Sequence, residues 1–193
     1  VFMADLNGKV VSQLTNSPGY DAEATVAFDG SKIIYTSIIS GDLEIWSMDK
    51  DGSNKKQLTN RLGYDGGAFF SSDGSKIVWR ASRPKTPVEV QEYRSLLKEH
   101  LVKPMQVEVF VANADGSEVM QLTDNGAANF APYFFPDGKP ELWTARTYIP
   151  SRWGDKHEFG ISRMYISIIL IYFEGLHENV ENVRKSKTNI INF

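Results

Sequence analysis

The sequence contains no cysteine, which excludes disulfide bonds, cysteine-ligated zinc and a thiol nucleophile. Its three histidines, at positions 100, 157 and 177, lack the spacing of a metal-binding pair, and we expect no metal and no cofactor. Acidic residues outnumber basic ones by 24 to 21, so no overall positive field favours nucleic acid as a partner. The longest apolar stretch, 164–173, is about half of the ~20 residues that a membrane helix needs. We therefore expect no membrane span.

A repeat dominates what is present. The triplet Gln-Leu-Thr occurs at 13–15, 57–59 and 121–123. Each copy follows a turn glycine by five residues and precedes an Asp-Gly pair by sixteen; the second Asp-Gly pair, for example, is Asp73-Gly74. The first two copies are 44 residues apart and the next two are 64 apart, which is one period plus an insertion of 20.

Within one period, short stretches of strand-forming residues alternate with turn residues. We predict strands over 24–28, 32–38, 43–48 and 55–59, with tight hairpins at the Asp-Gly pairs. Four antiparallel strands in about 44 residues are typical of one β-propeller blade. A β-sandwich also has short strands, but it would not repeat both motifs in register.

The motifs resemble the WD-like repeat of TolB-type propellers. The segment 51–59, Tyr64-Asp65 and the strand that follows Asp73-Gly74 carry the resemblance, and 134–138 matches best because it also has the proline. The resemblance covers about residues 3–144 and implies an all-β fold, a partial β-propeller of four-stranded antiparallel blades. It implies binding rather than catalysis, and a periplasmic or secreted location.

The repeat predicts two full blades and two half-blades, with boundaries near 15, 59 and 123. Propellers close with four to eight blades, so we expect something to complete the arc. Because Val1 stands in mid-pattern, we expect sequence upstream of it. The chain is a fragment of a longer propeller, or two chains form a homodimer that closes a six-bladed ring, or the arc is unstable.

The insertion, about 83–104, is predicted to be a helix. Thr86 and Glu89 form a capping box with Pro87 at the first helical position, and Pro104 is expected to end the helix. The expected buried face consists of Val90, Tyr93, Leu97 and Leu101. The helix either packs on its own propeller with solvated charges, or contacts a partner or covers the channel.

We predict that the insertion and the connections between blades share one face, where a protein partner would bind. Residues 80–104 hold six Lys or Arg and three Glu, a local basic excess. Asp21, Asp65 and Asn129 recur at one repeat position, where they hydrogen-bond the backbone between blades or form a ring that faces the channel. The candidate binding residues are Tyr20, Asp21, Tyr64, Asp65, Asn129, Phe130, Arg83, Lys85 and Arg94.

Catalytic signals are weak. The stretch 160–164 lacks the second glycine of a Gly-x-Ser-x-Gly elbow, and 155–158 reads as a surface turn. The Asp-x-Asn-Gly type turns, such as 5–8, lack the distal glutamate of a calcium loop. We therefore predict no catalytic and no metal-binding residue.

After residue 144 the repeat vanishes, and 145–193 forms a tail of uncertain fold. It contains a predicted strand over 166–173, followed by apolar residues at helical spacing. The tail is either unrelated to the propeller, as after a frameshift, or an added element that caps the open blade.

Two functions follow from the fold. The first is a non-catalytic scaffold that binds a protein partner through its loop face. The alternative is the propeller portion of a prolyl-oligopeptidase-like serine hydrolase whose catalytic domain lies outside this chain. A polysaccharide-active propeller would need clustered channel histidines, which are missing.

Overall fold

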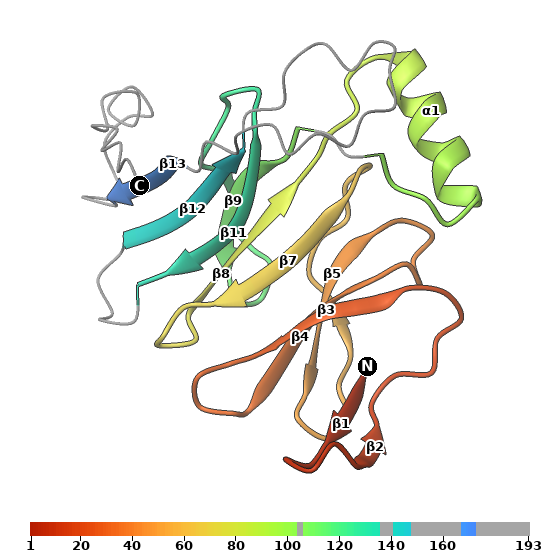
Figure 1. The fold of residues 1–193 in the computed structure, drawn as a ribbon, viewed down its shortest axis with the longest axis vertical. Coiled ribbons are helices and arrows are strands. Elements are labelled where there is room, and N and C mark those ends of the chain that lie inside the picture. Colours follow the sequence, from red (N-terminus) through yellow and green to blue (C-terminus); the bar gives the residue numbers. More distant parts are fainter. Residues whose placement is uncertain (104–105, 136–140, 148–166, 173–193) are drawn as a thin grey trace.

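The computed structural model of the protein describes residues 1–103, 106–135, 141–147 and 167–172. Four antiparallel sheets follow one another in chain order from the N-terminus (Figure 1). The strands of the first two sheets are β1 (Phe2–Ala4) and β2 (Val10–Gln13), then β3 (Asp21–Val26), β4 (Lys32–Ser37), β5 (Glu44–Asp49) and β6 (Lys56–Gln57). Those of the last two are β7 (Asp65–Phe70), β8 (Lys76–Ala81), β9 (Glu108–Asn113) and β10 (Met120–Gln121), then β11 (Ala128–Phe134), β12 (Glu141–Thr147) and β13 (Ser167–Tyr172).

The β3–β6 and β7–β10 sheets are the two predicted full blades, and the partial propeller is confirmed. The inner strands of these two blades, β3 and β7, start earlier than the sequence predicted. Asp21 already pairs with Ser37, and Asp65 already pairs with Ala81. We call β1–β2 the first half-blade, β3–β6 blade two, β7–β10 blade three and β11–β13 the last sheet.

The last sheet differs from the predicted half-blade, because β13 adds a third strand beside β12. The strand predicted over 166–173 is present as β13, so this part of the tail extends the sheet. The rest of the tail, including 155–158 and 160–164, lies outside the described residues. Closure of the ring by a second chain stays a prediction. It would require an incoming strand to replace β13, which occupies the edge of β12 that would otherwise be free.

The hydrophobic core lies between the blades. Ile34 and Ile45 of blade two pack with Ile77 and Trp79 of blade three in the largest buried cluster. A second cluster joins the first half-blade to blade two, and a third joins blade three to the last sheet. Because successive residues of a strand face opposite sides, one blade contributes to the clusters on both of its faces.

The structure explains why Gln-Leu-Thr recurs. In all three copies the glutamine side chain donates to the carbonyl of the threonine two residues on, and the leucine is buried. The hydroxyl of Thr59 accepts from the N–H of Ile45 at 2.8 Å, and Thr123 does the same for Val109. The triplet therefore fastens the outer strand of a blade to its neighbour and has a structural role.

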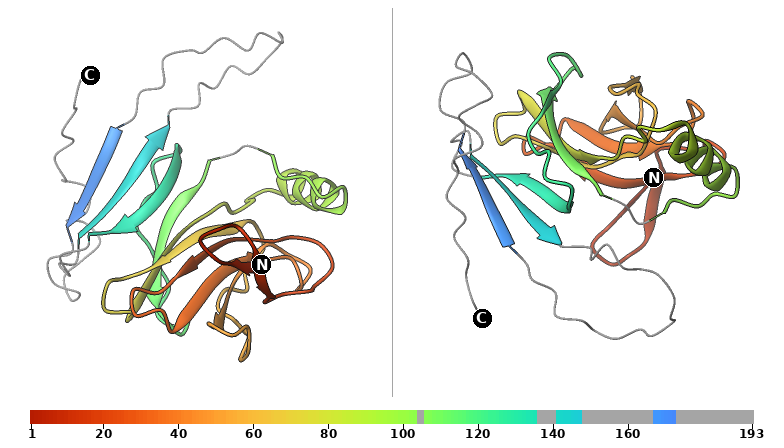
Figure 2. Two further views of the ribbon diagram at one scale, coloured as in Figure 1. Left: turned by 60° about the horizontal axis from the view of Figure 1, so that its bottom comes forward. Right: turned by 90° about the horizontal axis from the view of Figure 1, so that it is seen from above.

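The predicted helix is α1 (Pro87–Lys98), and its capping box at Thr86 is present. It projects from the end of β8, on the opposite side of the molecule from β12 and β13 (Figure 2). Tyr93 is its buried residue, and the Tyr93 hydroxyl donates to Asp42 of blade two. The predicted stripe was too long: the helix ends at Lys98, well before Pro104, and Leu101 is 56% exposed.

Candidate functional site

A pocket of about 1000 Å³ opens on the face where α1 and the connections between blades lie. Its wall comes from every blade junction that the structure describes and from the end of the insertion, so no single element forms it. Most of the wall is apolar. The lining residues are Pro18, Gly19, Tyr20, Ile38, Leu43, Tyr64, Arg80, Leu97, His100, Val102, Lys103, Val107 and Phe130.

A polar cluster around Arg80 forms one side of this pocket. Nη2 of Arg80 donates to Glu23 and, at 2.8 Å, to the hydroxyl of Tyr64. Glu23 also accepts from the N–H of Gly67 at 2.9 Å and from the Tyr64 hydroxyl at 2.9 Å. Burial, together with the charge of Glu23, raises the pKa of Tyr64, so the phenol keeps its proton and remains a donor.

A repeated β-bulge aims Glu23 at this cluster. The register of the inner strand shifts in β3, β7 and β11, and the bulge holds Glu23, Gly67 and Ala131 at φ values of 54°, 62° and 49°. Only Gly67 is a glycine, although this left-handed region is unfavourable for other residues. An extra residue in one strand redirects the neighbouring side chains. In blade two it turns the Glu23 carboxylate toward blade three.

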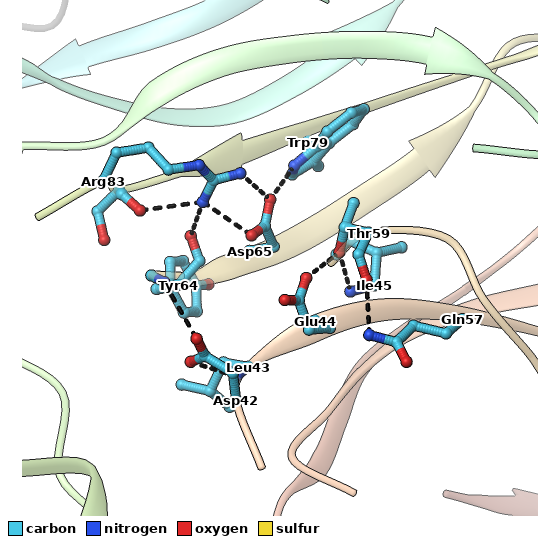
Figure 3. A network of polar contacts seen from close by, with 12 residues as sticks. Asp42, Leu43, Glu44, Ile45, Gln57, Thr59, Tyr64, Asp65, Trp79 and Arg83 are labelled. Carbon is cyan, nitrogen blue, oxygen red and sulfur yellow. Dashed lines mark hydrogen bonds and ion pairs between the residues drawn. The ribbon is translucent and has the colours of Figure 1, made fainter. Parts of the chain in front are cut away.

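The recurring acid of the repeat is buried in blade three (Figure 3). Asp65 is 0% exposed and accepts from Nε1 of Trp79 at 2.6 Å. It also accepts from both terminal nitrogens of Arg83, at 2.7 and 2.8 Å. These hydrogen bonds hold Arg83, at the start of the insertion, to the inner strand. Because Asp65 is completely buried, its carboxylate is a structural group and is not accessible to a molecule in solvent.

The other two members of that repeat position are also engaged within the protein. Asn129 is fully buried, and its amide donates to the carbonyl of Val107 at 2.9 Å, which ties the last sheet to blade three. Asp21 is half-buried and accepts from the hydroxyl of Ser17. Each of the three side chains therefore has at least one bond within the protein, and Oδ1 of Asp21 is buried without a hydrogen-bond partner among the described residues. A role for this repeat position around the channel stays a prediction.

The predicted binding residues are split by the fold. Tyr20, Tyr64 and Phe130 line the large pocket. Arg83 and Lys85 line a separate cavity of about 150 Å³. Arg94 is exposed on α1 and lines neither.

Sequence reasoning missed Arg80 and most of the apolar wall. One signal was available for Arg80, which occupies the repeat position of Thr36 in the preceding blade. Thr36 donates to Glu23 at 3.1 Å, so both residues hydrogen-bond the same carboxylate. The residues after α1, such as Val102 and Lys103, had no signal, since the repeat does not extend into the insertion.

Glu44 is a second buried carboxylate near this network (Figure 3). Its side chain is 2% exposed and accepts a hydrogen bond from the hydroxyl of Thr59. Burial raises the pKa of Glu44 from 4.5 to about 7, and the negative charges of Asp65 and Asp42 act in the same direction.

We expect the wild-type protein to lose stability relative to Glu44→Gln as the pH rises from 4.5 to about 7. In this range the folded carboxyl keeps a proton that the unfolded chain has released, so raising the pH disfavours the folded state. The loss in the free energy of unfolding is on the order of 3 kcal/mol and stays constant above the folded pKa. Urea denaturation of both proteins from pH 4 to pH 8 measures it, and parallel pH curves would contradict it.

Within the described ranges, no group of three or more His, Asp or Glu side chains is placed to hold a metal ion. No helix in the part of the chain that the structure describes has the length and apolar character to cross a membrane.

No family model matches the sequence, and no curated protein matches it. Solved structures are similar in fold. A putative TolB from Agrobacterium tumefaciens is 22% identical with a TM-score of 0.55, over 85% of this chain and 48% of that chain. TolB from Acinetobacter baumannii is 18% identical with a TM-score of 0.59, over 88% of this chain and 34% of that chain.

Enzymes are also among the similar structures. The tricorn protease is 12% identical with a TM-score of 0.56, over 95% of this chain and 17% of the protease. The chain spans less than half the length of each of these proteins. At such low identity the likeness concerns the fold alone, and it shows a TolB-like β-propeller-type fold.

Proposed function

We propose that this chain is part of a non-catalytic β-propeller scaffold that binds a segment of a protein partner in the pocket on its loop face. The pocket carries the proposal: it measures about 1000 Å³, its wall is mostly apolar, and a few polar groups converge on it. The TolB-like fold supports binding through loops on a rigid scaffold, and a periplasmic or secreted location forms part of the same proposal.

Phe130 is the best anchor for a partner on this surface. It is 41% exposed, lies on the inner strand β11 of the last sheet, and lines the pocket with its ring against the guanidinium of Arg80. Aromatic side chains, including Phe, are enriched at the centre of protein interfaces. Phe28, at 53% exposed, is outside the pocket and provides a matched control.

A random twelve-residue peptide display library, selected against the immobilised chain, tests the proposal. We expect selected peptides to bind Phe28→Ala as tightly as wild type and Phe130→Ala about tenfold or more weakly, because Phe130 would be an interface anchor. Affinities are measured by fluorescence polarisation of the labelled peptides. Selection of peptides that bind both variants equally, or of none, contradicts the proposal.

A hydrolase remains the second candidate, because the puromycin hydrolase structure shares this fold with a TM-score of 0.54 over 86% of the chain. In that case the propeller would flank a catalytic domain outside this sequence. A Gly-x-Ser-x-Gly elbow elsewhere in the same gene product would favour it, and its absence there would favour the scaffold.

A further inference from the structure

An ion pair between Glu23 and Arg80 lies beside the aromatic residues of the pocket. It joins blade two to blade three, and the side chains of Arg80 and Glu23 are only 18% and 24% exposed. Cζ of Arg80 lies 5.6 Å from the ring centroid of Tyr64 and 5.7 Å from that of Phe130. Both rings line the pocket, so the pair supports its aromatic wall with a charge that is neutralised within the chain.

The local backbone makes room for this pair. Glu23 adopts a φ of 54°, in the left-handed region that is unfavourable for a residue with a side chain. On β7, a Cβ at Gly66 would overlap the Glu23 carboxylate. A Cβ at the next residue, Gly67, would overlap the Arg80 guanidinium. One strained residue and two successive glycines thus accommodate the pair, and backbone strain that is kept in a folded protein is concentrated at functional sites.

The basic side chains in the pocket wall are paired inside the chain. Lys103, which also lines the pocket, forms an ion pair with Glu92 at 2.8 Å, and Arg80 is paired with Glu23. His100 is the remaining basic residue of the lining, and no Asp or Glu is among the described lining residues. At pH 8 an imidazole is uncharged. A charged side chain that entered the pocket at this pH would therefore lose its hydration without meeting a free counter-charge, which disfavours it.

An apolar side chain has more to gain in this pocket. Leu43 and Val107 are buried in its wall, whereas Val102 and Phe130 are exposed there. Covering exposed apolar surface removes it from water, and the gain in free energy grows with the area that is covered. The wall thus favours an occupant that is both uncharged and apolar.

We propose that the pocket takes an uncharged, apolar side chain of the bound partner segment, and that Glu23 sets this specificity by neutralising Arg80. The proposal rests on the proposed function, because it names the chemistry of the segment that the pocket binds. Glu23 acts as a positioning residue, since it holds the guanidinium against the rings of Tyr64 and Phe130 and removes the net charge from the wall. Without Glu23, the same arginine would attract an acidic side chain by its charge alone.

Selected peptides that depend on Phe130 provide the test. The peptide position that enters the pocket is the one whose replacement by alanine weakens binding to wild type much more than binding to Phe130→Ala. Forms of the peptide with Leu, Gln, Glu or Lys at this position are titrated at pH 8 by fluorescence polarisation. With wild type, we expect the Leu form to bind most tightly, and the Glu and Lys forms to bind about tenfold or more weakly than the Gln form.

The variant Glu23→Gln should change this charge preference. It leaves the charge of Arg80 without a partner, so we expect the Glu form of the peptide to gain about tenfold in affinity relative to the Gln form. Arg80→Gln leaves Glu23 unpaired and should reverse the sign, with the Lys form gaining instead. Asp49→Asn is the matched control, because it removes the carboxylate of a surface ion pair outside the pocket and should leave every ratio unchanged.

Each outcome decides the proposal. Wild-type protein that binds the Glu or Lys form as tightly as the Gln form overturns the specificity, and this comparison needs neither variant to fold. A Glu23→Gln or Arg80→Gln variant that is folded by circular dichroism but weakens all forms equally shows a purely structural pair and also overturns it. Both results leave the proposed function standing, because the peptides still bind through Phe130. Failure to select any peptide that depends on Phe130 overturns both proposals together.

Discussion

Replacing each of the three equivalent turn glycines by alanine is expected to destabilise the protein, least at Gly8, more at Gly52 and most at Gly116. All three have nearly the same backbone, with φ values of 82°, 86° and 86°. They differ in what lies beside them. A Cβ at Gly8 would meet nothing within 4 Å, one at Gly52 would lie 3.0 Å from the carbonyl oxygen of Leu14, and one at Gly116 would lie 2.5 Å from that of Leu58.

The two contacts are with the preceding blade, because Leu14 and Leu58 belong to Gln-Leu-Thr triplets. Gly8→Ala should cost about 1–2 kcal/mol, which is the strain of a left-handed alanine. Gly116→Ala adds an overpacking cost of about 1–3 kcal/mol, because backbone cannot move aside as a flexible side chain can. Gly52→Ala should fall between them.

Urea denaturation of the three variants measures the series. Gly74→Ala separates strain from contact within blade three, since Gly74 has a φ of 71° and open space around its Cβ position. Its cost should match that of Gly8→Ala. Equal losses at Gly8, Gly52 and Gly116 would show that blade contact at the turn does not limit these positions.

The second large effect is expected at the buried ion pair of Asp65 and Arg83. Asp65→Ala should lower the free energy of unfolding by about 3–5 kcal/mol, because it leaves a partly buried guanidinium and the indole N–H of Trp79 without their acceptor. Arg83→Met should also be strongly destabilising, since it leaves the fully buried carboxylate without a counter-charge.

The double variant, Asp65→Ala with Arg83→Met, should lose less than the sum of the two single losses, and thermal or urea unfolding gives this coupling. Lys32→Met is the matched control. It removes the cation of an ion pair whose lysine side chain is 50% exposed, and it should cost less than about 1 kcal/mol. Additive losses for the Asp65 and Arg83 variants would contradict the pairing.

If Asp65→Ala behaves as expected, the recurring acid is a structural group of the repeat. The repeat position then explains stability, and the binding surface has to be sought among the residues next to it. Tyr20, Tyr64 and Phe130 lie within one residue of Asp21, Asp65 and Asn129 along the chain, and all three line the pocket.

Local features of this protein were determined by the sequence alone. Asp-Gly turns and the capping box at Thr86 depend on residues within a few positions, whose backbone preferences and short-range hydrogen bonds act before any tertiary contact forms. The repeat period added the blades, because equivalent residues in each period form equivalent strands. The fold class, the two full blades and the place of the insertion between β8 and β9 were therefore predictable.

The tertiary structure decided the site. Glu23 and Arg80 are 57 residues apart, and they meet because the bulge at Glu23 turns the carboxylate toward the next blade. Tyr93 of the insertion reaches Asp42 across 51 residues, and this contact fixes α1 beside the pocket. Contacts between blades depend on how neighbouring sheets pack, and side chains distant in sequence carry no local signal of it. For that reason the repeat could predict only a candidate face, and packing decided which residues line the pocket on it.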